Sequence, residues 1–509
     1  MFISPKLSLS DLLGRDYTEA IARANDMLGV MSYDETMAVA DEKVDFYPEA
    51  KQKKNDEMLS KVGTQVIEPM NSSAEGAATA AFAKATTKGL APVTGFGNFR
   101  IGEDGKLYLV GKSEHYHTPL GHRFDGYKLI DNARKIGVLN ATHNNTRGHI
   151  TRLMEEKIVA MANGISETDK AKLDAIVKSE EPKVLNRVIN LETGSLACEA
   201  GLKMMLARFY KLDPTFPSPK YEGKTPVFFI MGDTKGGIEA NYHGTTIVAQ
   251  TLRGLWPQIR EKAAEGSLYK VVPVMINDLN DFEAKMKEYN SGNYKTAGFS
   301  HEIILMNYGG IRLTKEFLQG AYKLCKEYDT PVMCDEIQSC MWYKGAFLFR
   351  LYGLTPDFSI VGKGFPGGEY PASKIITTAE MDTLNQFGAL VTNGQEELAS
   401  LAYLITMTFM EANGDVVAEL GKRFDDGLKA ISAKYPEKIV CAEGLDLLAA
   451  LKTVDEAAEF AGKMKNACID SSVMLYKANC VPALLLKPPV IASEATVDFI
   501  LDTIDNLLK

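Results

Sequence analysis

Cysteine, basic charge and long apolar runs are all scarce in this chain of 509 residues. Its seven cysteines are odd in number and no pair has CxxC spacing, which argues against a disulfide framework or a zinc ribbon. Lys and Arg number 57 against 66 Asp and Glu, and this acidic balance argues against a nucleic-acid-binding protein. No run of about 18 uncharged apolar residues could form a membrane span, and the first residues do not resemble a secretory signal. We therefore expect a cytoplasmic protein that is not embedded in a membrane.

Apolar runs of strand length follow one another after about residue 185, with helical patterns between them. These runs do not alternate apolar with polar residues, so the predicted strands are buried on both faces. Alternating strands and helices predict an α/β fold, in which helices cover both faces of a mainly parallel sheet. The predicted strands span residues 226–231, 271–276, 303–306, 331–334 and 358–361.

The pattern changes along the chain and predicts three parts. Residues 1–150 are helical and then irregular, and we expect them to contribute to a small domain and to the mouth of the substrate site. Residues 151–395 contain the strand–helix alternation and form the predicted large domain. Residues 396–509 return to helices and shorter strands, which indicates a smaller α+β domain.

An acid and a lysine stand at the ends of neighbouring predicted strands. Asp335 ends the run at 331–334, and Lys363 follows the run at 358–361. Ligands bind at the carboxyl ends of parallel strands. Pyridoxal phosphate needs a lysine for covalent attachment and a carboxylate against its ring nitrogen. The same residues are also compatible with an ordinary ion pair beside a flexible glycine-rich turn.

The segment around these residues resembles the class III, subgroup II, aminotransferases, which are fold type I pyridoxal-phosphate enzymes. It reads Asp335-Glu336-Ile337-Gln338, then Pro356-Asp357, then Gly362-Lys363-Gly364, in the order of the family pattern. The resemblance implies that Lys363 forms the Schiff base with the cofactor. It also implies that Asp335 pairs with the pyridinium nitrogen and that Gln338 contacts the phenolic oxygen of the ring.

Two stretches upstream agree with this family pattern. Residues 193–200, TGSLACEA, open a predicted helix, and small residues at a helix N-terminus present free amides to phosphate. Gly194 and Ser195 are therefore the predicted phosphate binders, although a helix cap without a ligand would read the same. Residues 242–246, YHGTT, resemble the family's aromatic-His-Gly-Arg-Thr, which implies that Tyr242 stacks on the cofactor ring. Taken alone, Tyr242 reads as a core tyrosine.

A third stretch, at residues 392–399, implies a homodimer. It reads TNGQEELA and resembles the family's Thr-x-Gly-Gly-Asn-Pro-Leu-Ala, in which the threonine reaches the cofactor phosphate of the neighbouring subunit. Thr392 is the predicted residue in this role, so the active sites would lie at the subunit interface. The following helix would place Glu396 and Glu397 in its first turn, where both can face solvent.

The resemblance implies a transferase that moves an amino group between an amine or amino acid and a keto acid or aldehyde. An aminomutase, racemase or decarboxylase on the same fold, or a paralogue without activity, stays open, because fold does not fix reaction type. The family's Glu-Pro is absent before Gly309-Gly310, and Lys487 is the nearest residue to its C-terminal arginine. A nicotinamide dehydrogenase is disfavoured because the GxGxxG pattern is absent.

The substrate-binding residues are less defined by the sequence. The seven histidines are at 115, 117, 122, 143, 149, 243 and 301, so five fall within 115–149. That stretch could line the substrate pocket, be purely structural or hold a metal, although no carboxylate or cysteine completes a ligand set. Arg100, Arg123 and Arg147 are candidate binders of a substrate carboxylate, because guanidinium pairs bidentately with carboxylate.

Overall fold

The computed structural model describes residues 1–80, 87–89, 91–113, 118–140, 145–166, 168–389, 391–454, 457–474 and 480–509. The predictions that concern His115, His117 and His143 lie outside these residues. Within the described part of the chain, no helix combines the length and the apolar character needed to cross a membrane. The same residues contain no group of three His, Cys, Asp or Glu side chains placed to hold a metal ion.

The centre of the fold is a seven-stranded sheet with the strand order β6-β14-β13-β12-β9-β7-β8. Neighbouring strands run parallel except β14, which is antiparallel to both of its neighbours. The predicted, mainly parallel α/β sheet is therefore confirmed. Its strands are β6 Arg187–Leu191, β7 Thr225–Met231, β8 Lys270–Val274, β9 Tyr294–His301, β12 Val332–Asp335, β13 Phe358–Val361 and β14 Ser373–Thr377.

Helices flank this sheet and also occur in the N-terminal and C-terminal parts of the chain. In chain order they are α1 Leu9–Leu13, α2 Arg15–Leu28, α3 Tyr33–Ala40, α4 Glu49–Glu57, α5 Lys128–Lys135, α6 His149–Asn163, α7 Lys170–Val177, α8 Gly194–Leu206, α9 Ile247–Thr251, α10 Pro257–Glu265, α11 Leu279–Glu288, α12 Lys315–Glu327, α13 Leu348–Leu351, α14 Gln386–Ala389, α15 Glu397–Lys434, α16 Ala457–Asn466 and α17 Glu494–Leu508. Short 3-10 helices span Met58–Lys61, Asp125–Tyr127 and Met306–Tyr308.

Both faces of the central sheet are buried, as the mainly apolar predicted strands indicate. Strand β7 shows this within one element, because its side chains alternate between two cores. Phe229 packs in the larger core with Phe282 and Phe317, which come from α11 and α12. Phe228 packs in a second core that contains α8.

One central strand differs from its prediction. The run at 303–306 contributes only the two-residue strand β10, Ile304–Leu305, which pairs with β11, Ile311–Arg312. The sheet instead contains β9, whose sequence YKTAGFSH mixes polar and apolar residues. Those polar groups are buried with partners: Thr296 Oγ1 donates to Asn290 Oδ1 at 2.9 Å, and His301 Nε2 is 2.9 Å from the Tyr322 hydroxyl oxygen. Burial lowers the pKa of His301 to about 3, so this imidazole is neutral at pH 7.

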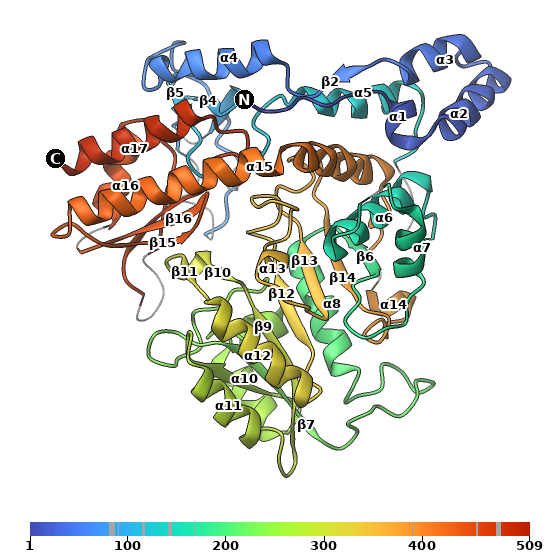
Figure 1. The fold of residues 1–509 in the computed structure, drawn as a ribbon, viewed down its shortest axis with the longest axis vertical. Coiled ribbons are helices and arrows are strands. Elements are labelled where there is room, and N and C mark those ends of the chain that lie inside the picture. Colours follow the sequence, from blue (N-terminus) through green and yellow to red (C-terminus); the bar gives the residue numbers. More distant parts are fainter. Residues whose placement is uncertain are drawn as a thin grey trace.

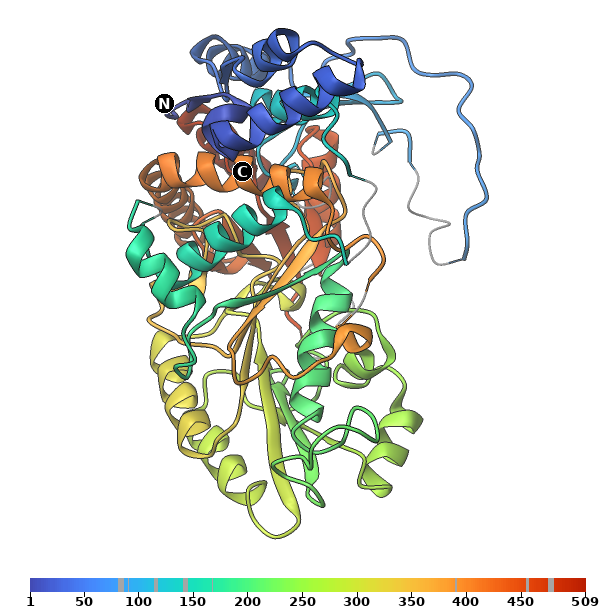
Figure 2. The same ribbon diagram turned by 90° about the vertical axis from the view of Figure 1, so that its right-hand side faces the viewer.

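The N-terminal and C-terminal parts of the chain lie together at one end of the sheet (Figures 1 and 2). The C-terminal four-stranded sheet has the order β15-β16-β18-β17, with β15 Ile439–Leu445, β16 Leu448–Thr453, β17 Ser472–Met474 and β18 Ala483–Leu486. The N-terminal sheet contains β3 Pro92–Phe96, β4 Phe99–Gly102 and β5 Leu107–Leu109, and β1 Lys6–Leu7 pairs with β2 Val44–Asp45. Backbone bridges join Leu109 to Ile469 and Lys112 to Lys487, so the two parts pack as neighbours.

Candidate active site

Asp335 and Lys363 meet at the carboxyl edge of the central sheet. Asp335 is the last residue of β12, and Lys363 follows the end of its parallel neighbour β13. Both side chains line a cavity of about 150 Å³. The lining residues are Thr193, Gly194, Ser195, Tyr242, Gly244, Glu302, Asp335, Ile337, Gln338 and Lys363. Every residue predicted from the sequence to contact the cofactor, except Thr392, therefore lines one cavity.

The Asp335 carboxylate is buried and surrounded by donors. Its side chain is 4% exposed, and its Oδ1 accepts a hydrogen bond from the backbone N–H of Ile337 at 3.0 Å. Its Oδ2 is 3.1 Å from Nδ1 of His243 and 3.7 Å from Sγ of Cys198. These contacts hold the carboxylate of Asp335 at the cavity wall, where it could pair with a positively charged ring nitrogen.

The N-terminus of α8 forms another wall of the cavity. Thr193 caps this helix without a side-chain hydrogen bond. Among the described residues, no group accepts a hydrogen bond from the backbone N–H of Gly194 or Ser195. Free amides and the positive end of the helix dipole favour an anion here. The Ser195 hydroxyl oxygen also accepts a hydrogen bond from the Thr245 backbone N–H at 3.1 Å, which holds the following loop against the helix.

Gly244 allows this loop to approach the helix closely. Its φ of +93° lies in the region that favours glycine, and an added Cβ would come within 2.9 Å of the Ser195 Cα. Any other residue would therefore be strained and would also push the loop away from α8. This glycine keeps Tyr242 and Ser195 on adjoining walls of the cavity.

Lys363 has an unusual backbone conformation. Its φ is +48°, which is uncommon for a residue with a side chain, and its side chain is half-buried. Such strained positions cluster at functional sites, where the surrounding structure holds them. The tight turn after β13 thus brings the Lys363 side chain to the cavity that Asp335 also lines.

Tyr242 lines the cavity and also contacts a cation. The guanidinium carbon of Arg253 is 4.2 Å from the centroid of its ring. Burial lowers the pKa of Arg253, although the side chain remains a cation at neutral pH. This cation–π contact braces the ring that borders the cavity.

Thr392 is exposed and does not line the cavity of its own chain. The helix predicted after it is α15, but the orientation predicted for Glu397 is wrong. Glu397 is 5% exposed, and its carboxylate accepts hydrogen bonds from Ile150 N at 2.8 Å and from the Thr151 hydroxyl at 2.8 Å. These groups belong to the first turn of α6, whose unpaired amides bind the carboxylate more favourably than solvent does. Only Glu396 stays partly exposed.

The arginines proposed as carboxylate binders are engaged elsewhere. Arg100 is buried and donates to the Gly89 carbonyl at 2.6 Å, and Arg123 donates to the Thr94 hydroxyl at 2.9 Å. Arg147 forms hydrogen bonds with both carboxylate oxygens of Glu155. Lys487 is fully buried, and its Nζ is 3.9 Å from the centroid of the Trp342 ring.

Sequence reasoning missed some residues at the site. His243 lies inside the motif that identified Tyr242. The motif placed it near the site, but the sequence did not predict its hydrogen bond to Asp335. Cys198 lies inside the phosphate motif, but its contact with Asp335 was not predicted from the sequence. Glu302 also lines the cavity, and no motif described above includes it.

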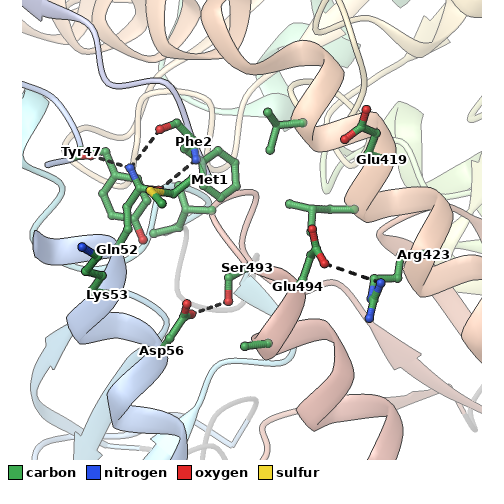
Figure 3. Close-up of a pocket in the computed structure, with 14 residues that line it drawn as sticks. Met1, Phe2, Tyr47, Gln52, Lys53, Asp56, Glu419, Arg423, Ser493 and Glu494 are labelled. Carbon is green, nitrogen blue, oxygen red and sulfur yellow. Dashed lines mark hydrogen bonds and ion pairs between the residues drawn. The ribbon is translucent and has the colours of Figure 1, made fainter. Parts of the chain in front are cut away.

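A larger cavity of about 640 Å³ lies apart from this site, between the N-terminus, α4, α15 and the start of α17 (Figure 3). Its cations are already paired: Arg423 binds Asp498 through two hydrogen bonds, and Lys53 binds Glu49. Its walls include no strand end of the central sheet. It therefore lacks the lysine and acid arrangement found at the carboxyl edge.

Comparison with known proteins shows which family and which relatives the sequence of this chain resembles. The family model described as aminotransferase class-III matches residues 117–508. An acetylornithine aminotransferase of Nostoc sp. is 26% identical over 275 residues, which is 53% of this chain and 63% of the relative. An ornithine aminotransferase of Exiguobacterium sp. is 27% identical over 279 residues, covering 53% of this chain and 64% of the relative. The chain therefore aligns with less than two thirds of the length of these relatives.

A solved structure extends the likeness to the fold. The ornithine aminotransferase of Toxoplasma gondii ME49 superposes with a TM-score of 0.65 at 19% identity, covering 82% of this chain and 90% of that one. The predicted fold type I architecture is thus confirmed.

The cavity residues fit pyridoxal phosphate, the cofactor of this family. The first turn of α8 offers free amides for a phosphate, and the buried Asp335 carboxylate suits a protonated ring nitrogen. Gln338 is 5% exposed, and its Oε1 has no hydrogen-bond partner among the described residues. A buried amide of this kind is satisfied when a polar group of a ligand enters the cavity.

Proposed function

The chain belongs to the class-III aminotransferase family, and from this premise we propose that it transfers an amino group from an amine or amino acid to a keto acid or aldehyde. The observation that carries the proposal is the single cavity lined by Lys363, Asp335 and the N-terminus of α8. Bound pyridoxal phosphate supplies covalent capture of the amine and withdrawal of electrons through its ring.

The residues that line the cavity would bind the cofactor and move protons during the reaction. The Lys363 amine would hold the cofactor covalently between turnovers and, once released, move a proton to and from the reacting carbon. The Asp335 carboxylate would keep the ring nitrogen protonated. Gly194 and Ser195 would bind the phosphate through their amides, Tyr242 would stack on the ring, and Gln338 would contact its phenolic oxygen.

The proposal is tested by an absorbance scan followed by a donor screen. Purified protein mixed with pyridoxal phosphate should show the visible band of covalently bound cofactor. Ornithine and acetylornithine, which the names of its relatives contain, are the first amines to add, and a true donor should bleach the band. A keto acid should then restore it. Bleaching without restoration would favour another reaction on the same fold, and the absence of any band would contradict the proposal.

We further propose that two copies share their active sites. Thr392 is exposed on its own chain, as expected for a residue that completes the site of a neighbour. Replacing Thr392 by valine should weaken cofactor retention by about 1–3 kcal/mol, which is the loss of one hydrogen bond to a charged group. Equilibrium dialysis of pyridoxal phosphate against both proteins measures the difference.

Mixed dimers test whether Thr392 contributes to the active site of its own subunit or of the neighbouring one. If one chain carries Lys363→Ala and the other Thr392→Val, sharing places both lesions in one site and leaves the second site intact. The matched control carries both substitutions on one chain, which leaves no intact site. Equal cofactor retention per active site in the two mixtures, or activity from a monomer, would contradict the shared site.

A further inference from the structure

The donors around Asp335 include one that is unusual beside a carboxylate. Oδ2 of Asp335 is approached by His243 at 3.1 Å and by Cys198 at 3.7 Å, while Oδ1 accepts from the Ile337 backbone. Sulfur is larger than oxygen or nitrogen, so 3.7 Å suits an S–H···O hydrogen bond. Cys198 and His243 are both 0% exposed, so both donors are shielded from solvent.

The thiol of Cys198 keeps its proton in this position. Burial first, and then the negative charge of Asp335, raise the pKa of Cys198 well above its ordinary value. The charged groups that share this end of the sheet with it include Glu302, Glu199 and the neighbouring Asp335 itself. The sulfur is therefore a thiol, which donates, and not a thiolate, which would repel the carboxylate.

Helix α8 connects this thiol to the phosphate-binding turn. Residues four apart lie on the same face of a helix, so Cys198 stands one turn below Gly194 on the face that borders the cavity. The first turn of α8 thus lies where the phosphate is expected, and the second turn contacts the acid expected at the ring nitrogen. One rigid helix fixes the separation between these two contacts.

We propose that Cys198 is a positioning residue that donates its S–H to Asp335 and, together with His243, keeps this carboxylate ionised and directed into the cavity. This role rests on the proposed function, because it acts through the pairing of Asp335 with the ring nitrogen. A buried carboxylate without enough donors takes up a proton more readily. Loss of the thiol would therefore favour a neutral Asp335 beside an unprotonated ring nitrogen, which withdraws electrons less strongly.

Two substitutions separate donation from packing. Cys198→Ala removes the donor, whereas Cys198→Ser keeps a hydroxyl that donates in the same place. With pyridoxal phosphate labelled with 15N at its ring nitrogen, the unchanged protein and Cys198→Ser should show a protonated nitrogen by NMR. Cys198→Ala should show a larger unprotonated fraction at pH 8, and its turnover should fall about 3- to 10-fold, the effect of one ordinary hydrogen bond.

The control is Cys325→Ala, which empties a fully buried position on α12 remote from the cavity. It should lower thermal stability without changing the 15N signal. If Cys198→Ala does not fold, Cys198→Val fills the space without a donor and takes its place. An unchanged 15N signal in the variants without a donor, or a serine variant that behaves like alanine, overturns the role of Cys198. Failure of the unchanged protein to bind the cofactor would instead overturn the proposed function and this role with it.

Discussion

Replacing Lys363 by alanine should abolish covalent attachment of pyridoxal phosphate and lower turnover by at least about 10²–10⁴-fold, the range for loss of one general acid–base group. Reduction of the unchanged protein with borohydride should fix a pyridoxyl label, and peptide mapping should place that label on Lys363. The geometry supports this residue because its side chain lines the same cavity as Asp335. Its strained φ of +48° is a second indication of a functional position.

Lys374 is the alternative lysine for covalent attachment of the cofactor, and it provides a control for the experiment. It is 1% exposed on β14, and burial lowers its pKa to about 8, so its amine loses a proton more easily than an ordinary lysine. It does not line the cavity, and its Nζ is 5.2 Å from the centroid of the Tyr403 ring. Lys374→Met should therefore keep the label and the activity. A label on Lys374 would show that amine basicity and not cavity geometry selects the attachment site.

The relation between Lys363 and Asp335 was predictable because it depends on strand ends. The runs that became β12 and β13 are short and mainly apolar, which is typical of strands buried on both faces. Parallel neighbours bring their carboxyl ends to one edge, so residues far apart in the sequence meet there. The same logic failed for β9, because its buried Thr296 and His301 find partners in Asn290 and Tyr322 that a periodic pattern does not reveal.

Residues that act through other residues were the hardest to predict. Cys198 and His243 contact the acid and not the cavity contents, so nothing in their type or spacing marks them as donors. Glu397 was equally hard to predict, because its carboxylate accepts a hydrogen bond from the first turn of α6, a helix that lies far away in the sequence. Such pairings depend on how separate helices pack. Local sequence therefore favours solvent exposure for a glutamate that the fold buries.

Asp335→Asn should leave the fold and phosphate contacts in place while turnover falls by about 10²–10³-fold or more, as expected when one preorganised electrostatic contact is lost. An amide carries no charge to hold a proton on the ring nitrogen. It also has one acceptor oxygen where the carboxylate has two, so its NH₂ group must face either the Ile337 amide or the donors His243 and Cys198. Single-turnover kinetics with a confirmed donor measure the chemical step, and dialysis measures cofactor retention.

Asp357→Asn is the matched control for losing a buried carboxylate. Asp357 is also 4% exposed, but it lies at the start of β13, where it binds Lys183 at 2.6 Å and the Val332 amide at 2.7 Å. Its replacement should cost stability, because Lys183 loses its partner, while the rate of the chemical step stays near that of the unchanged protein. If Asp335→Asn behaves in the same way, losing stability and keeping its rate, then Asp335 is a structural acid and the ring-nitrogen assignment is wrong. If only Asp335→Asn slows the chemical step, then Asp335, at the carboxyl end of β12, is the acid that pairs with the ring nitrogen.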